Sequence, residues 1–373
     1  MIISIYADNL RVFTSMMPQR GLLIQYIEDH PEHQFVFYLH SRFREEKVLS
    51  DFFGRLSKFS NWSLRILKTK QIISRAFQLL GYPSPILPNG SDVYISPDIE
   101  TFGKANRPVI NFLADMTVFD DIQHTSLSPF NSKFRRKCIT GMSRRSDLLV
   151  VVSKFTRQRF LHYFPENESK TRVLYNGIDD LWFSQPAATL ISINPYWIWM
   201  GGSFTSRKNL ERLLEAYGAL LSMNTAGIPE IQIVGLDQAS VDRLKAYLNS
   251  AGLEQRVRIR SKVSTSELIN LVDLSSGVLF PSIYEGFGLP VVEAFARGKP
   301  VLVSNVSSLP EISNEMGIMC DPNSVNSILH GLQTMLANPS SETLVSARRN
   351  WAGQFTYKVA SKAFDQMIDE IRE

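Results

Sequence analysis

The segment 277–304, GVLFPSIYEGFGLPVVEAFARGKPVLVS, carries the residues best suited to chemistry. It predicts a buried strand, then a loop at 285–288 with two glycines, then a helix that begins near Leu289. Glycines ahead of a helix N-terminus let backbone N–H groups approach an anion, and the helix dipole favours phosphate. Glu285 and Glu293 could each accept hydrogen bonds from sugar hydroxyls. The alternatives are a solvated loop charge for Glu285 and a helix-dipole carboxylate for Glu293.

Short apolar runs alternate with amphipathic stretches over almost the whole chain, which must position this segment. The predicted strands are 1–6, Gln34–Leu39, Asp92–Ile95, Val109–Leu113, Leu148–Val152, Arg172–Tyr175, Tyr196–Met200, Ile231–Val234, Arg256–Arg260, Val278–Phe280 and Val301–Val303. The predicted helices lie near 19–30, 44–60, 70–80, 131–146, 154–164, 208–223, 238–250, 265–273, 289–297, 322–337 and 340–372. Unalternated Val, Ile and Leu strands separated by helices predict an α/β protein with doubly wound parallel sheets.

The length of 373 residues is too great for one ordinary core and fits two domains of roughly 150–200 residues. The break falls at Asn176-Gly177-Ile178-Asp179, a turn signal followed by a Pro-containing stretch up to Pro195. Two doubly wound sheets joined by one linker predict a ligand cleft at the carboxyl ends of their strands.

The composition is that of an ordinary globular protein, with 44% hydrophobic and 20% charged residues, which excludes a disordered chain. Cys138 and Cys320 cannot make a disulfide framework and lack partners at metal spacing, so a reducing compartment is expected. The apolar start 1–6 is too short for a secretory signal. The charge-free run Leu181–Ser206 contains prolines and paired glycines, so it predicts a linker and a strand in a soluble chain.

The charge is unevenly distributed. Residues 1–180 carry 24 Lys and Arg against 18 Asp and Glu, whereas residues 181–373 carry 16 against 18. Within 42–75 there are nine basic and three acidic residues. Such a patch suits an anionic membrane, a phosphorylated acceptor or nucleic acid, or it is only a solvated face. No motif of a nucleic-acid reader accompanies it, so nucleic acid is not expected as a partner.

Glu285 through Glu293 resembles the E-x7-E segment of retaining glycosyltransferases of the GT-B fold, family 4. Further segments match that family in the expected order. They are VVSKFTRQRF (151–160), VLYNGID (173–179), GGSFTSRKNLERLLEAY (201–217), IQIVG (231–235) and Phe355-Thr356-Tyr357. The resemblance is strong over about 147–372 and weak before 108. It implies an acceptor-binding Rossmann-like domain over 1–180, a donor-binding one over 181–354, and a C-terminal helix, 355–373, that crosses back to the first domain.

The resemblance also implies roles for single residues. Glu285 would contact the transferred sugar and act in catalysis together with Asp115. Glu293 would bind the nucleotide ribose, and Gly235 would border the base. The diphosphate and the sugar would be held by Gly202, Ser203, Arg207, Lys208 and the amides of Gly286, Phe287, Gly288 and Leu289. The chain has no Asp-x-Asp motif, so these cations and a helix end are expected to replace a metal.

Two positions depart from the family pattern. Many relatives have Gly-Arg in the diphosphate loop, whereas Ser203 follows Gly202 here and Arg207 is expected to supply the second cation. Relatives carry His-Asp after a strand of the first domain, whereas Ala114 precedes Asp115 here. Asp115 therefore has two interpretations, a catalytic carboxylate or a turn carboxylate. His124 is nearby in sequence, although a lone His more often has a structural role.

The resemblance implies a retaining, metal-independent hexosyltransferase of bacterial surface polysaccharide or lipopolysaccharide assembly. The donor would be a nucleotide diphosphate sugar, GDP-mannose being favoured, and no cofactor is expected. The acceptor would be a glycan or a polyprenyl-diphosphate-linked glycan. The enzyme would be cytoplasmic and peripheral on the inner face of the membrane, bound through the basic first domain. The alternative is an inactive nucleotide-sugar or glycan-binding relative, which Ala114 favours.

Overall fold

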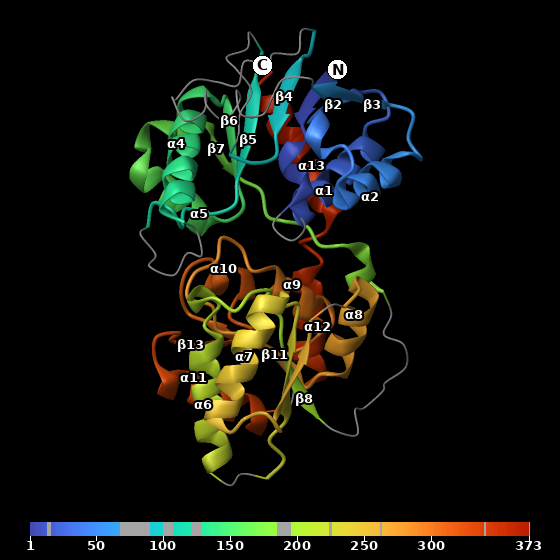
Figure 1. The fold of residues 1–373 in the computed structure, drawn as a ribbon. Helices are drawn as coiled ribbons and strands as arrows, with labels where there is room; N and C mark the ends of the chain where they lie inside the picture. Colours follow the sequence, from blue (N-terminus) through green and yellow to red (C-terminus); the bar gives the residue numbers. More distant parts are fainter. Residues whose placement is uncertain are drawn as a thin grey trace. The chain divides into compact units, whose positions relative to one another are not determined.

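The computed structural model describes residues 1–12, 16–67, 90–99, 107–120, 128–184, 195–223, 226–261, 263–338 and 341–372. They divide into two compact units (Figure 1). Unit 1 contains the described residues from Met1 to Gly177 together with those from Thr356 onward, and unit 2 contains Ile178–Phe355. The first division lies three residues before the predicted boundary at 180/181, and the second lies one residue after the predicted boundary at 354/355.

Unit 1 is built on a seven-stranded sheet of order β3-β2-β1-β4-β5-β6-β7, in which every described pairing is parallel. The strands are β1 Ile2–Tyr6, β2 Gln34–His40, β3 Trp62–Leu67, β4 Val93–Ser96, β5 Val109–Leu113, β6 Leu148–Val151 and β7 Thr171–Val173. The helices are α1 Met17–Asp29, α2 Lys47–Leu56, α4 Pro129–Arg145, α5 Lys154–Tyr163 and α13 Tyr357–Glu370. Parallel order brings all the carboxyl ends of these strands to one edge.

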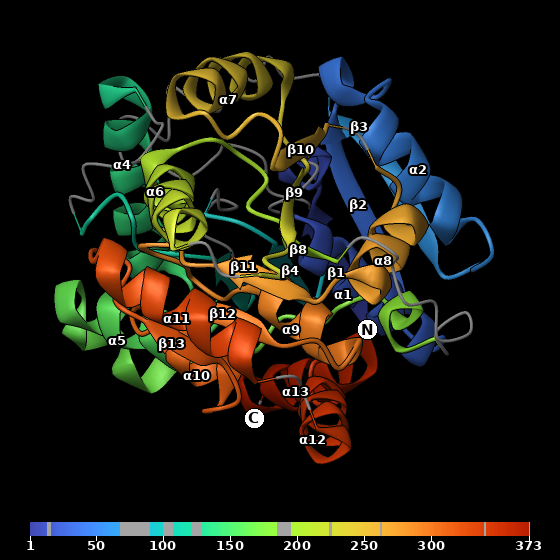
Figure 2. The ribbon, with the colours of Figure 1, turned by 90° about the horizontal axis from the view of Figure 1, so that it is seen from below.

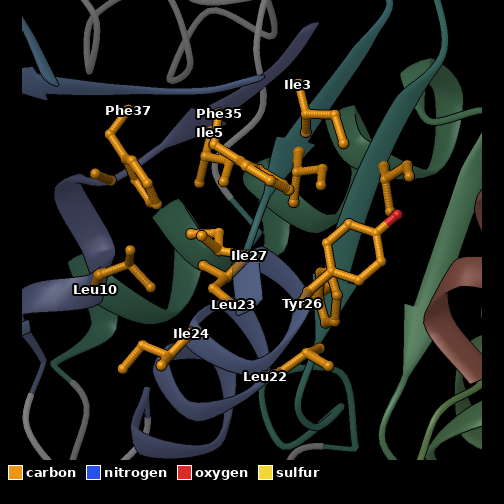
Figure 3. Packing of buried hydrophobic residues seen from close by; sticks show 14 of the residues in the cluster. Ile3, Ile5, Leu10, Leu22, Leu23, Ile24, Tyr26, Ile27, Phe35 and Phe37 are labelled. Carbon is orange, nitrogen blue, oxygen red and sulfur yellow. The ribbon is translucent and has the colours of Figure 1, made fainter. Parts of the chain in front are cut away.

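Apolar side chains cover both faces of this sheet. On one face, residues of α1 such as Leu23 and Ile27 pack against Ile5, Phe35 and Phe37 (Figure 3). On the other face, α4 and α5 bury a second cluster around strand β6. Successive residues of β6 join opposite clusters, which is why the strand is continuously apolar.

The C-terminal helix α13 belongs to the core of unit 1, as the sequence predicts. Phe364 and Ile368 are fully buried in the same cluster as α1. The ring of Tyr357, the first residue of α13, lies where a Cβ on Gly21 or Gly177 would stand, within 1.9 Å and 2.6 Å respectively. Only glycine allows this close approach, so the packing of α13 requires glycine at both positions.

Unit 2 has a six-stranded, all-parallel sheet of order β10-β9-β8-β11-β12-β13. The strands are β8 Tyr196–Trp199, β9 Glu230–Val234, β10 Val257–Arg260, β11 Gly277–Phe280, β12 Val301–Ser304 and β13 Ile318–Cys320. The helices are α6 Leu210–Ser222, α7 Gln238–Ala251, α8 Thr265–Leu274, α9 Leu289–Ala296, α10 Leu309–Ser313, α11 Val325–Ala337 and α12 Glu342–Ala352. Helices α6 and α11 lie side by side, and α12 packs on α9 (Figures 1 and 2).

The predicted fold class, two doubly wound parallel sheets, is confirmed, with corrections in detail. The sequence prediction missed strand β3, whose alternating exposure marks a half-solvated edge strand, and the three-residue strand β13. It also missed the short helix α10. The single helix predicted over 340–372 is wrong, because α12 ends before Gly353 and α13 starts at Tyr357, after Thr356 caps it. The helix predicted near 70–80 lies outside the described residues.

Two further expectations can be compared with the structure. Cys138 and Cys320 are both free and buried. Within the described residues, none of the helices combines the length and the apolar character needed to cross a bilayer.

Candidate functional site

The carboxyl edge of the unit 2 sheet begins with a glycine loop after β8. The Trp199 indole occupies the place of a Cβ on Gly201, with atoms 2.0 Å away, so that position admits no side chain. Gly202 follows with φ of +74°, and a Cβ on Gly235, after the neighbouring strand β9, would lie 3.8 Å from the Gly202 Cα. The two loops therefore meet through backbone, and Gly202 faces open space. Ser203, next to it, is half-buried.

Three charged side chains meet at this edge. The Lys208 Nζ donates to the Glu285 Oε1 at 2.7 Å, and the Arg207 Nη1 lies 3.0 Å from the Glu285 Oε2. The same Arg207 Nη1 donates to the Tyr284 carbonyl at 2.7 Å, while the Lys208 ammonium lies 5.2 Å from the centroid of the Phe280 ring. The loop before α6 and the loop before α9, 77 residues apart in sequence, thus form one cluster.

The ion pairs decide the protonation state of Glu285. Burial alone would raise its pKa, but Lys208 and Arg207 outweigh burial and lower the pKa of Glu285 to about 2. The carboxylate is therefore ionised at neutral pH and holds two cations in fixed positions. A diphosphate that enters this edge would meet both cations and a carboxylate that competes for them.

The loop that carries Glu285 is fixed by serines after β12. The Glu285 N–H donates to the Ser307 Oγ at 3.1 Å. The Ser308 Oγ donates to the carbonyls of Glu285 and Phe287 at 2.9 and 2.7 Å. Gly288, with φ of +118°, then begins α9. This bracing leaves the half-buried Gly286 and the first turn of α9 in a defined geometry.

Glu293 differs from Glu285 in its partners and in the direction of its pKa shift. It lies on α9 with 6% of its surface exposed, and its carboxyl group makes no hydrogen bond or ion pair with any described residue. Burial raises the pKa of Glu293 to about 7. A buried carboxyl without partners is costly unless a ligand supplies donors, so this position suits a group rich in hydroxyls.

Sequence reasoning missed Asn209 as a residue of this site. Asn209 has φ of +57° and is buried, and its Nδ2 donates to the carbonyls of Pro281 and Pro322 at 2.9 and 2.8 Å. It thereby ties the start of α6 to the ends of β11 and β13. The Arg-Lys-Asn triplet at 207–209 was the available signal.

Several acids lie among the described residues at the carboxyl edge of unit 1. Asp115, after β5, accepts from the backbone N–H and the hydroxyl of Thr117, so it makes the turn that the sequence allowed. Asp98, after β4, was not predicted. Burial raises the pKa of Asp98, against the nearby Arg135, and the charge of Asp115 adds to the rise. The two carboxyl groups are close enough to influence each other.

A buried Asp–His pair lies at the same edge. The Asp8 Oδ2 is 2.6 Å from the His40 Nδ1 and accepts from the Tyr6 hydroxyl at 3.0 Å. Both Asp8 and His40 are at most 1% exposed. Ala114 follows β5 where the family pattern has a histidine, and His124 lies outside the described residues.

The structure brings most of the predicted donor-site residues to one edge of unit 2, at the ends of β8, β9 and β11. Glu293 lies within α9, which follows this edge. The Phe287 ring is buried, with its centroid 5.7 Å from that of the Phe355 ring. Asp115 belongs to unit 1.

Comparison with family models gives two matches. Residues 185–352 match the model described as glycosyl transferases group 1, and residues 117–180 match the model described as glycosyltransferase family 4. Together the two models cover more than half of the chain.

Three curated relatives illustrate the likeness. The O-antigen chain mannosyltransferase B of Escherichia coli is 31% identical over 245 residues, which are 62% of this chain and 64% of that protein. The serotype-specific mannosyltransferase WbdA of E. coli is 30% identical over 45% of this chain and 21% of its own length. A Campylobacter jejuni N-acetylgalactosaminyltransferase, named for a diphospho-undecaprenol-linked acceptor, is 26% identical over 74% of this chain and 70% of that protein. The chain thus spans less than two thirds of each mannosyltransferase.

Solved structures show the same fold. Anabaena HepE in complex with UDP-glucose superposes with a TM-score of 0.71 at 16% identity, over 99% of this chain and 100% of that chain. A glycosyltransferase from Rickettsia africae gives a TM-score of 0.72 at 15% identity, over 99% of this chain and 98% of that chain. Both have the GT-B fold, and so does this chain.

Proposed function

The chain belongs to the group 1 and family 4 glycosyltransferases, and from this premise we propose that it is a retaining enzyme using a nucleoside diphosphate sugar. The transferred unit is a hexosyl group, with mannosyl and a GDP donor favoured. The acceptor is a glycan or a polyprenyl-diphosphate-linked glycan of bacterial surface polysaccharide or lipopolysaccharide assembly. The relatives' names support this choice, since two are O-antigen or serotype mannosyltransferases and one acts on a diphospho-undecaprenol substrate.

The observation that carries the proposal is the cluster of Lys208, Arg207 and Glu285 beside the glycine loops. As the sugar bond breaks, negative charge develops on the leaving diphosphate, and fixed cations stabilise it without reorganisation. Lys208 and Arg207 supply that charge, and the amides of Gly286 to Leu289 add the dipole of α9. In unit 2, no group of three or more described His, Cys, Asp or Glu side chains converges as metal ligands would. The proposed transfer is metal-independent, with these cations and amides in the place of a metal.

The two carboxyl groups contact different parts of the donor. Glu285 is ionised and contacts the transferred sugar, where its negative charge stabilises positive charge at the anomeric carbon. Glu293, buried and unpaired, accepts hydrogen bonds from the ribose hydroxyls. Gly202 and Ser203 border the diphosphate, and Gly235, whose loop meets Gly202, borders the base.

The basic surface of unit 1 supports a cytoplasmic enzyme that works at the inner face of the membrane. Arg42, Arg44, Lys47, Arg55, Lys58 and Arg65 are all exposed. The aromatic residues among them pack in or against the core: Phe52 is buried, and the partly buried rings of Phe53 and Trp62 stack with centroids 5.6 Å apart. The attraction to an anionic surface is therefore electrostatic.

A screen of GDP-, UDP-, dTDP- and ADP-sugars by thermal shift tests donor use, because a ligand of the native state raises the melting temperature. The best donor is then incubated with a pooled lipid-linked acceptor extract, and the anomeric configuration of the product is determined. Transfer with retention is expected. Ala114 favours one competing function, a binding protein without activity. Donor binding with neither transfer nor hydrolysis would establish that alternative.

A further inference from the structure

The turn between α1 and β2 carries a cluster that the glycosyltransferase site does not use. Its members are His30, Glu32 and His33, in the sequence His-Pro-Glu-His. In the part of the chain that the structure describes, this is the one group of three or more His, Cys, Asp or Glu whose potential ligand atoms all lie within 4.8 Å of one another. It belongs to unit 1, whereas the Lys208–Glu285 cluster belongs to unit 2.

The spacing of the atoms is that of ligands around a small cation. The Glu32 Oε1 lies 3.1 Å from the His30 Nδ1 and 3.4 Å from the His33 Nδ1. Zinc bonds to imidazole nitrogen and carboxylate oxygen of about 2.0–2.2 Å place tetrahedral ligands roughly 3.3–3.5 Å apart. The two rings stack with centroids 5.1 Å apart and 17° between their planes. Because imidazole binds a metal in its ring plane, one of the stacked rings has to turn before both nitrogens face the same ion, whereas the Glu32 carboxylate already lies within reach of both nitrogens.

One of these nitrogens is buried without a hydrogen-bond partner. The His33 Nδ1 is inaccessible to solvent, and its contact with Glu32 does not have hydrogen-bond geometry. An orphaned nitrogen with an available lone pair is a reason to expect a ligand there.

A second carboxylate orients His30 from behind. The Asp365 Oδ1, on α13, lies 3.4 Å from the His30 Nε2 and accepts from the Tyr26 hydroxyl at 3.0 Å. The Tyr26 ring packs 4.3 Å from the His30 ring. The His30 Nδ1 is hydrogen-bonded to Glu32 at 3.1 Å, and a metal would replace the proton of that bond. The Asp365 carboxylate beside Nε2 could then hold the remaining proton, which is the usual support of a metal-bound histidine.

We propose that His30, Glu32 and His33 bind a divalent transition-metal ion of the Zn²⁺ class, with water completing the shell. Two imidazoles and one carboxylate are ligands that suit such an ion better than Mg²⁺ or Ca²⁺. The side chains of His30 and His33 are 16% and 12% exposed, whereas Glu32 is 60% exposed, so the ion enters from the solvent side of Glu32. The bound ion ties the α1–β2 turn to helix α13 through Asp365.

The test is calorimetric titration of the full chain with Zn²⁺ at neutral pH, with Co²⁺ absorption as a second readout of coordination. One tight site is expected. His33→Ala and Glu32→Gln should each weaken binding at least about tenfold and remove the Co²⁺ spectrum, since each takes away a ligand. Asp365→Asn should weaken Zn²⁺ binding about 10- to 100-fold while the ligands remain. Glu32 is exposed, so its variant is expected to fold normally.

His162→Ala is the matched control, because His162 is exposed on α5 of the same unit. It should bind Zn²⁺ as the wild type does. The proposal is overturned if the wild type binds no Zn²⁺, or if His33→Ala and Glu32→Gln bind it with wild-type affinity. The cluster would then be an ion pair between Glu32 and protonated histidine.

Discussion

The two sheets have the same strand order over six strands, but the charged side chains at their carboxyl edges differ. At the carboxyl edge of unit 2, two cations surround one ionised carboxylate, beside loops whose glycines expose backbone. At the corresponding edge of unit 1, the described residues include three acids, Asp8, Asp98 and Asp115, with His40 beside the first and Arg135 near the second. A cationic edge suits an anionic diphosphate, and an acidic edge suits hydroxyl groups of an acceptor. Two similar sheets can therefore provide different binding chemistries through the loops that follow their strands.

The largest expected effect tests the centre of the cationic edge. Glu285→Gln keeps the shape but removes the charge opposite Lys208 and Arg207. Turnover should fall by roughly 100- to 1000-fold, as for other groups that act mainly in the transition state. Affinity for the free nucleoside diphosphate should persist or improve, because the competing carboxylate charge is gone. Steady-state kinetics and calorimetry measure the two effects separately.

Glu254→Gln provides the control for this change, since Glu254 is an exposed carboxylate of the same unit. It should leave both quantities unchanged. If Glu285→Gln turned over at nearly the normal rate, Glu285 would be an ordinary loop carboxylate.

The next effect concerns binding alone. Lys208→Ala removes a charge-assisted contact to the diphosphate, which is worth about 1.5–3 kcal/mol, or roughly ten- to a hundredfold in Kd. Calorimetry with the nucleoside diphosphate measures it, and thermal unfolding confirms that the variant is folded. Lys245→Ala, at an exposed position of α7, should bind normally. Equal affinities for the two variants would remove Lys208 from the donor site.

The sequence predicted the cationic edge much better than the acidic one, for a physical reason. The predicted donor-site residues lie in short segments whose glycines and Arg-Lys-Asn triplet encode local backbone geometry, so each segment can be recognised on its own. Asp8 and His40 are 32 residues apart and meet only because β1 and β2 pair in a particular register. Likewise, Asp98 and Asp115 influence each other only because they follow the neighbouring strands β4 and β5. Such pairs depend on strand order, which local patterns do not specify.

The protonation of Glu293 could not be predicted from sequence either. A carboxylate that interacts with a helix dipole and a buried carboxyl group can stand at the same position of a helix, so the sequence does not distinguish them. Burial from α9 packing, seen only in three dimensions, raises the pKa of Glu293 to about 7, whereas Glu285, eight residues earlier, is lowered to about 2. The tertiary contacts, and not the residue type, separate the two.

A third prediction asks whether the acidic edge takes part in transfer. Asp115→Asn keeps an oxygen that can accept from Thr117, so the turn should survive. We expect turnover to fall by about tenfold or more, equivalent to about 1.4 kcal/mol in the barrier, without loss of nucleoside diphosphate affinity. Thr117→Val, which removes the hydroxyl partner but keeps the Asp115 charge, is the control for the turn. Similar losses in both variants would assign Asp115 a purely structural role.

A fourth prediction uses the pKa of Glu293. Ribose hydroxyls donate to the ionised carboxylate and lower its pKa, so nucleotide binding near pH 7 should release up to one proton and weaken as pH falls. Calorimetry in buffers of different ionisation enthalpy measures the release. Glu293→Gln should abolish it, whereas Glu254→Gln should not. Proton release that is unchanged in Glu293→Gln would contradict the assignment.

The raised pKa of Glu293 also predicts how the free energy of unfolding changes with pH. The folded pKa of Glu293 is raised from 4.5 to about 7, so its favourable contribution is complete below pH 4.5 and is lost as pH rises through 7. Glu285 has the opposite sign: its contribution is present above pH 4.5 and is lost as pH falls toward 2. In urea unfolding, Glu293→Gln should remove the pH dependence of the free energy of unfolding only between pH 4.5 and about 7. Glu285→Gln should remove it only between about pH 2 and pH 4.5.

The last prediction concerns the exposed basic side chains of unit 1 and leaves the chemical step unchanged. If exposed basic side chains attract an anionic membrane, each contributes about 1 kcal/mol near the surface, and salt screens the attraction. The triple change of Arg55, Lys58 and Arg65 to Glu should abolish binding to anionic vesicles at low salt, while wild-type binding should fall at high salt. Co-sedimentation measures both. The charge-matched control is Lys245, Lys358 and Lys362 changed to Glu, all at exposed positions outside the patch. If the two triple variants lose binding equally, the net charge of the protein governs binding, and the position of the basic patch does not. If the wild type and the variant of the patch pellet alike, the patch is only a solvated face.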